Sequence, residues 1–150
     1  MKNFLISLVV AGLLVSCNSN SVTTTSTEKA PVDKLVANFC DGWNNHDSTG
    51  VKNQFLDDAI LIDDHILTSS IAEMSSKWIR PNMPHIKSIT PTKLQEWSTG
   101  DRAGYTGTYK MVFIKPKGDL GNSNGLLTVN WLKTAQGEWK ITNAHIHSVD

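Results

Sequence analysis

The sequence has few cysteines, no excess of either charge and no internal repeat. Its 150 residues include 14 basic and 14 acidic side chains and only two cysteines. Nucleic-acid phosphates are bound by clustered Lys and Arg. The charges here are evenly spread and form no such basic cluster, so no nucleic-acid partner is expected. Beyond the first sixteen residues no apolar run is long enough to cross a bilayer. The length fits one domain and a targeting segment.

The first sixteen residues have the character of a signal peptide. Lys2 gives a positive start, and residues 4–15 form an almost unbroken apolar run. Residues 14–17, Leu-Val-Ser-Cys, resemble the lipobox of bacterial lipoproteins. This resemblance implies that residues 1–16 are removed and Cys17 is acylated, so the mature chain is lipid-anchored in the bacterial cell envelope and faces the periplasm or the exterior. The alternatives are an ordinary secretory signal with an incidental cysteine and a transmembrane anchor, for which the apolar run is shorter than the usual span of about 20 residues.

Residues 17–30 are rich in Ser, Thr and Asn and contain almost nothing apolar. Such a segment buries too little surface to fold, so a flexible tether is expected between the membrane and a domain at residues 31–150. With Cys17 assigned to lipid, Cys40 has no partner for a disulfide within the chain. Cys40 lies in an apolar helical stripe and is interpreted as a small buried hydrophobe rather than a nucleophile.

The first part of this domain has helical periodicity. Pro31 suits the first turn of a helix. Six apolar residues follow it at helical spacing, namely Val32, Leu35, Val36, Phe39, Cys40 and Trp43. A second short helix is expected after a cap at Asp47 or Ser48. Ser70 and Glu73 form a capping box for a third helix, which is expected to stop before Pro81.

Strand patterns dominate the rest of the domain. Residues 59–62 are apolar and partly β-branched, and they predict one short early strand. From His85 onward long strands are expected, separated by turns at residues 98–101 and 135–138 and by a loop at residues 115–125. Helices first and an antiparallel meander afterwards predict an α+β domain with the helices packed on one face of the sheet.

Three motifs in this order carry a resemblance to a known family. They are Phe39-x-x-x-Trp43-Asn44-x-His46-Asp47, then Phe55-Leu56-Asp57-Asp58-Ala59, and finally Gly137-Glu138-Trp139-Lys140-Ile141 leading to His145. From residue 32 to residue 150 the chain resembles the nuclear transport factor two-like superfamily, which includes ketosteroid isomerases and SnoaL-like cyclases. The resemblance implies a cone-like, curved antiparallel sheet wrapped around three N-terminal helices, with an apolar pocket at its wide end.

This pocket is expected to bind a small apolar or amphipathic molecule. The candidate lining residues are aromatic or polar side chains expected on the inner face, namely Phe39, Trp43, Trp78, Tyr105, Tyr109, Trp131, Trp139 and His145. Phe39 and Trp139 sit where the helix or strand pattern requires bulk, so they are interpreted as core. The ligand-binding prediction therefore rests on Trp43, Trp78, Tyr105, Tyr109, Trp131 and His145.

The same resemblance allows the catalytic residues of the family to be compared with this sequence. Ketosteroid isomerases use an Asp general base, and the resemblance places Asp63 on that position. The family's oxyanion-binding Tyr falls on Phe39, and its buried Asp falls near Val129 or Asn130. Losing one oxyanion donor lowers the rate by about 10²–10³-fold, which argues against this activity. Two hypotheses remain: a non-catalytic binding domain, and a SnoaL-like cyclase, isomerase or hydro-lyase that uses Asp63 and His145 as acid and base.

The remaining expectations concern metals and partners. His145 and His147 have a spacing that a metal uses, with Asp63 or His46 as a third ligand, but the plainer interpretation is one pocket histidine and one exposed histidine. No cofactor is expected, and His85 is assigned to the loop surface. One sheet face is expected to expose the apolar residues Val112, Ile114, Leu126 and Leu132, which favours a homodimer.

Overall fold

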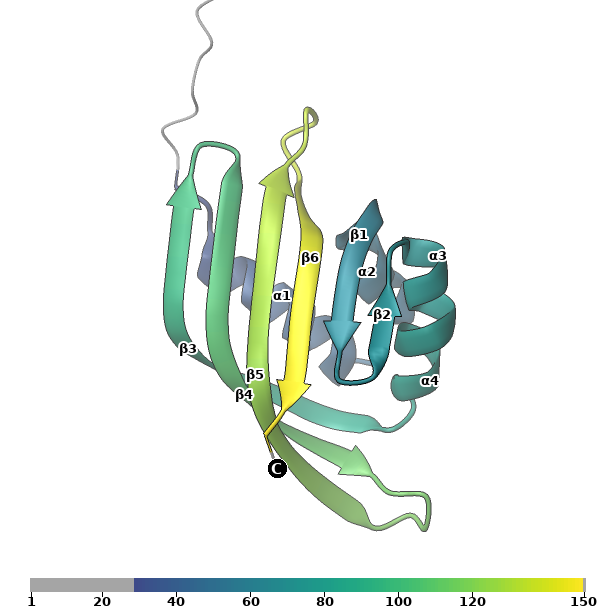
Figure 1. Cartoon of the computed structure of the whole chain (residues 1–150). Coiled ribbons are helices and arrows are strands. Elements are labelled where there is room, and N and C mark those ends of the chain that lie inside the picture. The colour runs from purple at the N-terminus through teal and green to yellow at the C-terminus, as the bar shows by residue number, and fades with distance from the viewer. Residues whose placement is uncertain (1–28, 150) are drawn as a thin grey trace, which may run out of the picture.

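The computed structural model describes residues 29–149. The predicted signal peptide at residues 1–16, Cys17 and most of the predicted tether therefore lie outside the described residues. The helical elements are α1 (Val32–Asn44), α2 (Ser48–Asn53), α3 (Ile71–Met74), the π-helical turn η1 (Ser75–Ile79) and α4 (Arg80–Asn82). The strands are β1 (Phe55–Asp63), β2 (Ile66–Thr68), β3 (Ile86–Thr99), β4 (Arg102–Ile114), β5 (Leu120–Lys133) and β6 (Trp139–Ser148). This is the α+β architecture that the sequence predicts (Figure 1).

The six strands form one curved sheet in the order β2-β1-β6-β5-β4-β3. β3 to β6 form the expected antiparallel meander, but β1 pairs with β6 in parallel, so the sheet is mixed and not purely antiparallel as predicted. The chain crosses from β2 to the far edge through α3, η1 and α4, and the meander then returns to β1. Strand patterns identify the strands, but they do not specify which edges meet or in which direction. The predicted loop at residues 115–125 is also shorter, because β5 already begins at Leu120.

Helix α1 lies across one face of the sheet, which we call the inner face. Its predicted apolar stripe is confirmed, with Val32, Val36, Phe39, Cys40 and Trp43 buried. Asn44, at the end of α1, donates from Nδ2 to the carbonyl of Ile89 at 3.2 Å and accepts from the Ile89 amide at 2.6 Å. This paired contact attaches the last turn of α1 to β3, because it satisfies both backbone groups of one strand residue.

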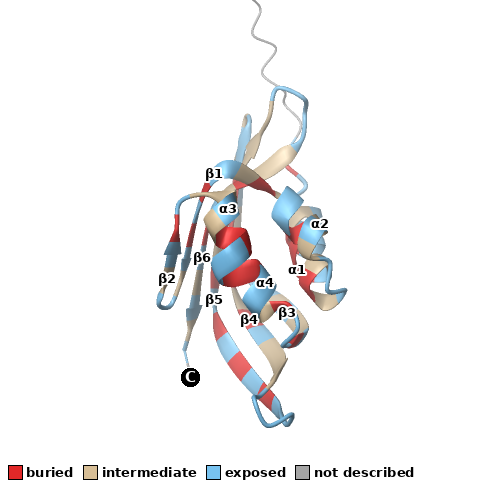
Figure 2. Cartoon of the chain, turned by 90° about the vertical axis from the view of Figure 1, so that its right-hand side faces the viewer, coloured by how far each residue is buried: buried red, intermediate tan, exposed pale blue. Residues whose placement is uncertain are grey.

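The third helical segment also covers the inner face (Figure 2). It begins as predicted, since Ser70 Oγ accepts from the Glu73 amide, but it does not stop before Pro81. In η1 the Arg80 amide bonds to the carbonyl of Ser75, five residues back. The α-helical ladder is therefore already interrupted when Pro81 enters the first turn of α4, where a missing amide proton is tolerated.

The π-turn places Trp78 against both α1 and the sheet. Its ring meets the ring of Trp43 edge to face, with centroids 4.7 Å apart. Along β5, buried and exposed residues alternate as expected for a strand with one covered face (Figure 2). Within the described residues no helix has the length and apolarity needed to cross a membrane.

Candidate functional site

A cavity of about 370 Å³ lies between the helices and the inner face of the sheet. This volume is within the range of about 300–1,000 Å³ that is usual for small-molecule sites. Its deepest walls are buried and mostly apolar, and they are formed by Phe39, Trp43, Trp78, Ile86, Tyr109, Ser123 and Leu127. Its more exposed walls are formed by Asp63, Asp64, Asn82, His85, Ile89, Met111, Phe113, Ile146 and Ser148. The cavity therefore combines an apolar floor with polar groups near its mouth.

Asp63 is the last residue of β1 and is half-buried in the cavity wall. Trp78 donates from its indole Nε1 to the Asp63 Oδ2 at 2.5 Å. Burial raises the pKa of Asp63 above its ordinary value of 3.8, because desolvation penalises the charged carboxylate. The hydrogen bond from Trp78 opposes this pKa shift, the charge of Asp64 adds to it, and His145 opposes it weakly. Asp63 thus holds its proton more tightly than a solvated aspartate does.

Asp64 follows Asp63 directly but has a different environment. Its backbone has a positive φ of 40°, a conformation that Asp and Asn tolerate better than most residues. Its carboxylate accepts from the Ser148 amide at 3.1 Å, from the Ser148 hydroxyl at 2.9 Å, and contacts His147 Nδ1 at 2.9 Å. The Ser148 hydroxyl is the main cause that lowers the pKa of Asp64. Asp64 therefore joins the end of β1 to the end of β6.

Tyr109 adds a third titratable group to the cavity. It projects from β4 onto the inner face, and burial raises the pKa of its hydroxyl. Hydrogen bonding to Ser148 and Ser123 counteracts part of that rise. The polar side of the cavity is therefore formed by side chains from β1, β4, β5 and β6.

The structure brings four of the predicted residues to this cavity. Trp43, Trp78 and Tyr109 line its floor, and Asp63 lines its wall. Phe39, which was interpreted as core, also lines the floor and packs its ring against Trp43 with centroids 6.5 Å apart.

Three of the predicted aromatic residues lie elsewhere. Tyr105 and Trp131 are buried on the inner face but do not line the cavity. Trp131 pairs with Ala103, next to the β3–β4 turn, whereas the cavity lies at the end of β4 and the start of β5. Trp139, interpreted as core, is partly buried under the cation of Lys133, whose Nζ lies 5.9 Å from its ring centroid. The correct face was thus predicted for Tyr105 and Trp131, but not the position along the strand.

His145 lies on the opposite, outer face of the sheet, where it is exposed and does not line the cavity. The cause is a β-bulge in β6, where Asn143 pairs with Asn130 and Ile141 pairs with Trp131. Thr142 is therefore an extra residue, which reverses the alternation of side chains beyond it. As a result Ile146 and Ser148 face the cavity, and the predicted inward position of His145 is corrected.

The possible metal ligands are not brought together. His147 also lies on the outer face, next to Asp64, and His46 Nε2 lies 2.7 Å from the carbonyl of Ile86. In the part of the chain that the structure describes, no group of three His, Cys, Asp or Glu side chains is placed to hold a metal ion.

Several cavity residues were missed from the sequence. His85, assigned to the loop surface, lies at the mouth with Asn82, whose side-chain amide donates to the carbonyl of Trp78 at 3.0 Å. Met111 and Phe113 share the face of Tyr109 on β4, so the strand alternation already contained a signal for them. Ile146 and Ser148 had no such signal, because their orientation depends on the bulge.

Neither a protein-family model nor a curated protein matches this sequence. Solved structures do match. A ketosteroid isomerase-like protein from Erwinia carotovora atroseptica has a TM-score of 0.73 at 12% identity, covering 83% of this chain and 98% of that one. A nuclear transport factor 2-like superfamily protein from Salmonella enterica serovar Typhimurium has a TM-score of 0.69 at 13% identity, covering 78% and 87%. A nuclear transport factor 2-like protein with a cystatin-like fold from Novosphingobium aromaticivorans has a TM-score of 0.64 at 12% identity, covering 79% and 80%. The chain therefore has the nuclear transport factor 2-like fold.

Proposed function

We propose that the cavity binds a small amphipathic molecule in the bacterial cell envelope and does not transform it. The carrying observation is a cavity of about 370 Å³ with an aromatic floor and one half-buried carboxyl group, Asp63, in its wall. The apolar body of the ligand packs against Trp78 and Tyr109. Asp63 Oδ2 accepts from Trp78, and no other hydrogen bond to Asp63 is found among the described residues, so its second oxygen is available to a donor on the ligand.

The surroundings of Asp63 support binding more than catalysis. Phe39 lines the cavity where ketosteroid isomerases carry a Tyr, and Val129, near the position of their buried Asp, is a fully buried aliphatic residue. The acid–base partner proposed from the sequence, His145, lies on the outer face. General acid–base catalysis requires a partner within hydrogen-bond reach of the same substrate, and the sheet separates His145 from the cavity.

The second candidate function is an enzyme in which Asp63 acts as the acid or base of a SnoaL-like cyclase, isomerase or hydro-lyase. One observation favours it: burial raises the pKa of Asp63, as is common for catalytic carboxyl groups. In that case Asp63 works without His145. Substrate turnover that is abolished in Asp63→Asn would decide for this candidate.

A dye titration tests the binding function. An anilinonaphthalene sulfonate dye, which is amphipathic, should bind the protein and increase in fluorescence. Met111→Trp adds bulk to the cavity wall and should abolish this binding, whereas Lys110→Trp adds the same side chain at the exposed neighbouring position and should preserve it. Equal binding by both variants would reject the cavity as the site.

We also propose that the mature chain is anchored to a membrane through lipid on Cys17, and that it forms a homodimer. The anchor rests on the apolar run at residues 4–15 and on the sequence that precedes Cys17. Cell fractionation of Cys17→Ser tests it, with release of the protein from the membrane as the expected result. Membrane association and normal processing that survive this substitution would reject it.

A further inference from the structure

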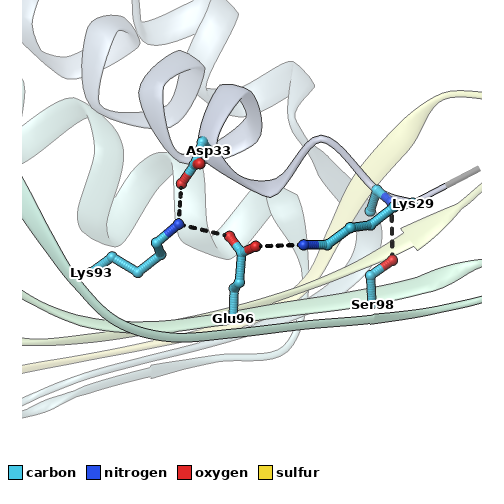
Figure 3. A network of polar contacts seen from close by, with 6 residues as sticks. Lys29, Asp33, Lys93, Glu96 and Ser98 are labelled. Atoms are coloured by element: carbon cyan, nitrogen blue, oxygen red, sulfur yellow. Dashed lines mark hydrogen bonds and ion pairs between the residues drawn. The ribbon is translucent and has the colours of Figure 1, made fainter.

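The beginning of the described chain is docked onto the carboxyl end of β3. Ala30 and Val32 are only 4% and 2% exposed, so this segment belongs to the core. The Ala30 amide donates to the Ser98 hydroxyl at 3.0 Å, close to the last residue of β3 (Figure 3). The position at which the chain enters the domain is therefore fixed by burial and by a directed hydrogen bond.

A chain of ion pairs fixes the same position (Figure 3). Lys29 Nζ lies 2.8 Å from Glu96, whose other carboxylate oxygen lies 3.1 Å from Lys93 Nζ. Lys93 in turn lies 2.8 Å from Asp33, in the first turn of α1. Such exposed pairs contribute little stability singly, but this network links Lys29, β3 and α1 in one geometry.

The cavity mouth lies at the other end of the sheet. It is built from His85 just before β3, Phe113 near the end of β4 and Asp63 at the end of β1. In Figure 1 the start of β3 and the end of β4 lie toward the bottom, whereas the chain enters at the top, beside the β3–β4 turn. Ser98 is twelve residues after Ile86, the first residue of β3, which corresponds to about 40 Å along the strand.

From this arrangement we propose that the mouth of the cavity faces away from the membrane, so that its ligand is a water-borne amphipathic molecule and not a lipid taken directly from the bilayer. This inference rests on the proposed lipid anchor at Cys17 and on the proposed binding cavity. Lys29 is twelve residues after Cys17, and a chain of this length reaches about 40 Å at most when fully extended. Bringing the mouth to the bilayer would thus use the whole reach of this segment.

The orientation is tested on the full-length lipidated protein in phosphatidylcholine vesicles that carry a headgroup quencher. One variant, Gln136→Cys, receives a thiol-reactive fluorophore in the β5–β6 turn, at the end where the chain enters. The other, Lys117→Cys, receives it in the β4–β5 turn, at the end of the cavity mouth. In the lipidated protein the sulfur of Cys17 carries the lipid, and burial raises the pKa of the Cys40 thiol to about 12, so the parent protein should take up no label.

We expect the quencher to reduce the fluorescence at residue 136 severalfold and to leave the fluorescence at residue 117 nearly unchanged. Equal quenching at the two positions, or stronger quenching at residue 117, on protein that stays bound to the vesicles would overturn this inference and leave the anchor standing. Protein that does not stay on the vesicles would overturn the anchor and this inference together. Failure of the protein to bind the anilinonaphthalene sulfonate dye would reject the proposed binding function. It would not change the quenching result, which reports only the orientation of the domain.

Discussion

Asp63 and Asp64 are neighbours in the chain, yet their environments move their pKa values in opposite directions. Asp63 faces the cavity, where burial raises its pKa, and Asp64 bonds to the end of β6, where the Ser148 hydroxyl lowers its pKa. A positive φ at Asp64 turns the chain directly after β1, so the two carboxyl groups have different surroundings. The divergence supports the proposal that Asp63 contacts the ligand, whereas the hydrogen bonds of Asp64 connect β1 to β6.

The first prediction concerns Asp63→Asn. Because the folded-state pKa of Asp63 lies above 3.8, the folded protein binds this proton more tightly than the unfolded chain does, and the free energy of unfolding falls as the pH rises through that range. Asn does not ionise, so the variant lacks this pH-dependent loss of stability, and its side-chain oxygen can still accept the hydrogen bond from Trp78. We therefore expect the difference in unfolding free energy, variant minus parent, to increase as the pH rises from below 3.8 to neutral. Urea denaturation across this range measures it, and a stability difference that does not vary with pH would contradict the assignment.

Asp64→Asn should show the opposite pH dependence. The folded-state pKa of Asp64 lies below 3.8, so its contribution to stability is present above 3.8 and is lost as the pH falls through the folded-state pKa. Asn also tolerates the positive φ, so backbone strain does not confuse the comparison. We expect a loss at neutral pH of at most about 1 kcal/mol, because solvent screens this contact. The same urea denaturation series should show that the destabilisation by Asp64→Asn disappears in acid. A destabilisation that grows in acid would contradict the lowered pKa of Asp64.

Trp78→Phe tests the hydrogen bond to Asp63. Removing the indole donor removes a contact that lowers the pKa of Asp63, so that pKa should rise further. Loss of a hydrogen bond to a charged group should also reduce stability by about 1–3 kcal/mol. NMR titration of the Asp63 carboxyl carbon measures the pKa. Trp97→Phe, on the outer face, is the control and should leave this pKa unchanged, and an unchanged value in Trp78→Phe as well would show that the bond is not formed in solution.

A fourth prediction concerns the homodimer. The outer face exposes Ile60, Ile62 and Leu67 on β1 and β2, as well as the predicted Leu126, whereas Val112, Ile114 and Leu132 are only partly exposed. Leu126→Glu would bury a charge in the interface and should convert a dimer to a monomer at micromolar concentration. Leu94→Glu, on an exposed residue in the bulge of the edge strand β3, is the matched control and should leave the dimer intact. Sedimentation velocity distinguishes the two, and a monomeric parent protein would reject the proposal.

The sequence predicts most of the helical part of the fold for local reasons. The stripe from Val32 to Trp43 is set by one helix repeat, and the caps at Asp47 and Ser70 involve residues three positions apart. The helical segment that continues through Pro81 was missed, because its π-turn changes the hydrogen-bond partners just before the proline. Local rules thus predict where helices begin better than where they end.

The site was predicted only in part, because it depends on contacts between distant strands. Trp43, Trp78, Tyr109 and Asp63 were found from periodicity and from the family resemblance. The orientation of His145 depends on one extra residue in β6, which appears only when β6 is paired with β5. The parallel pairing of β1 with β6 likewise places Asp63 beside Ile146, a neighbour that no local pattern specifies.

Mapping the bound dye by NMR tests the binding function most directly. With methyl groups labelled, titration with the anilinonaphthalene sulfonate dye should shift the resonances of Ile89, Met111 and Ile146 in the cavity. The resonances of Ile60 and Ile62 on the outer face should stay in place. Saturable shifts confined to the cavity methyl groups are the result that the binding function predicts. Shifts confined to the outer face, or no shifts at saturating dye, would contradict it.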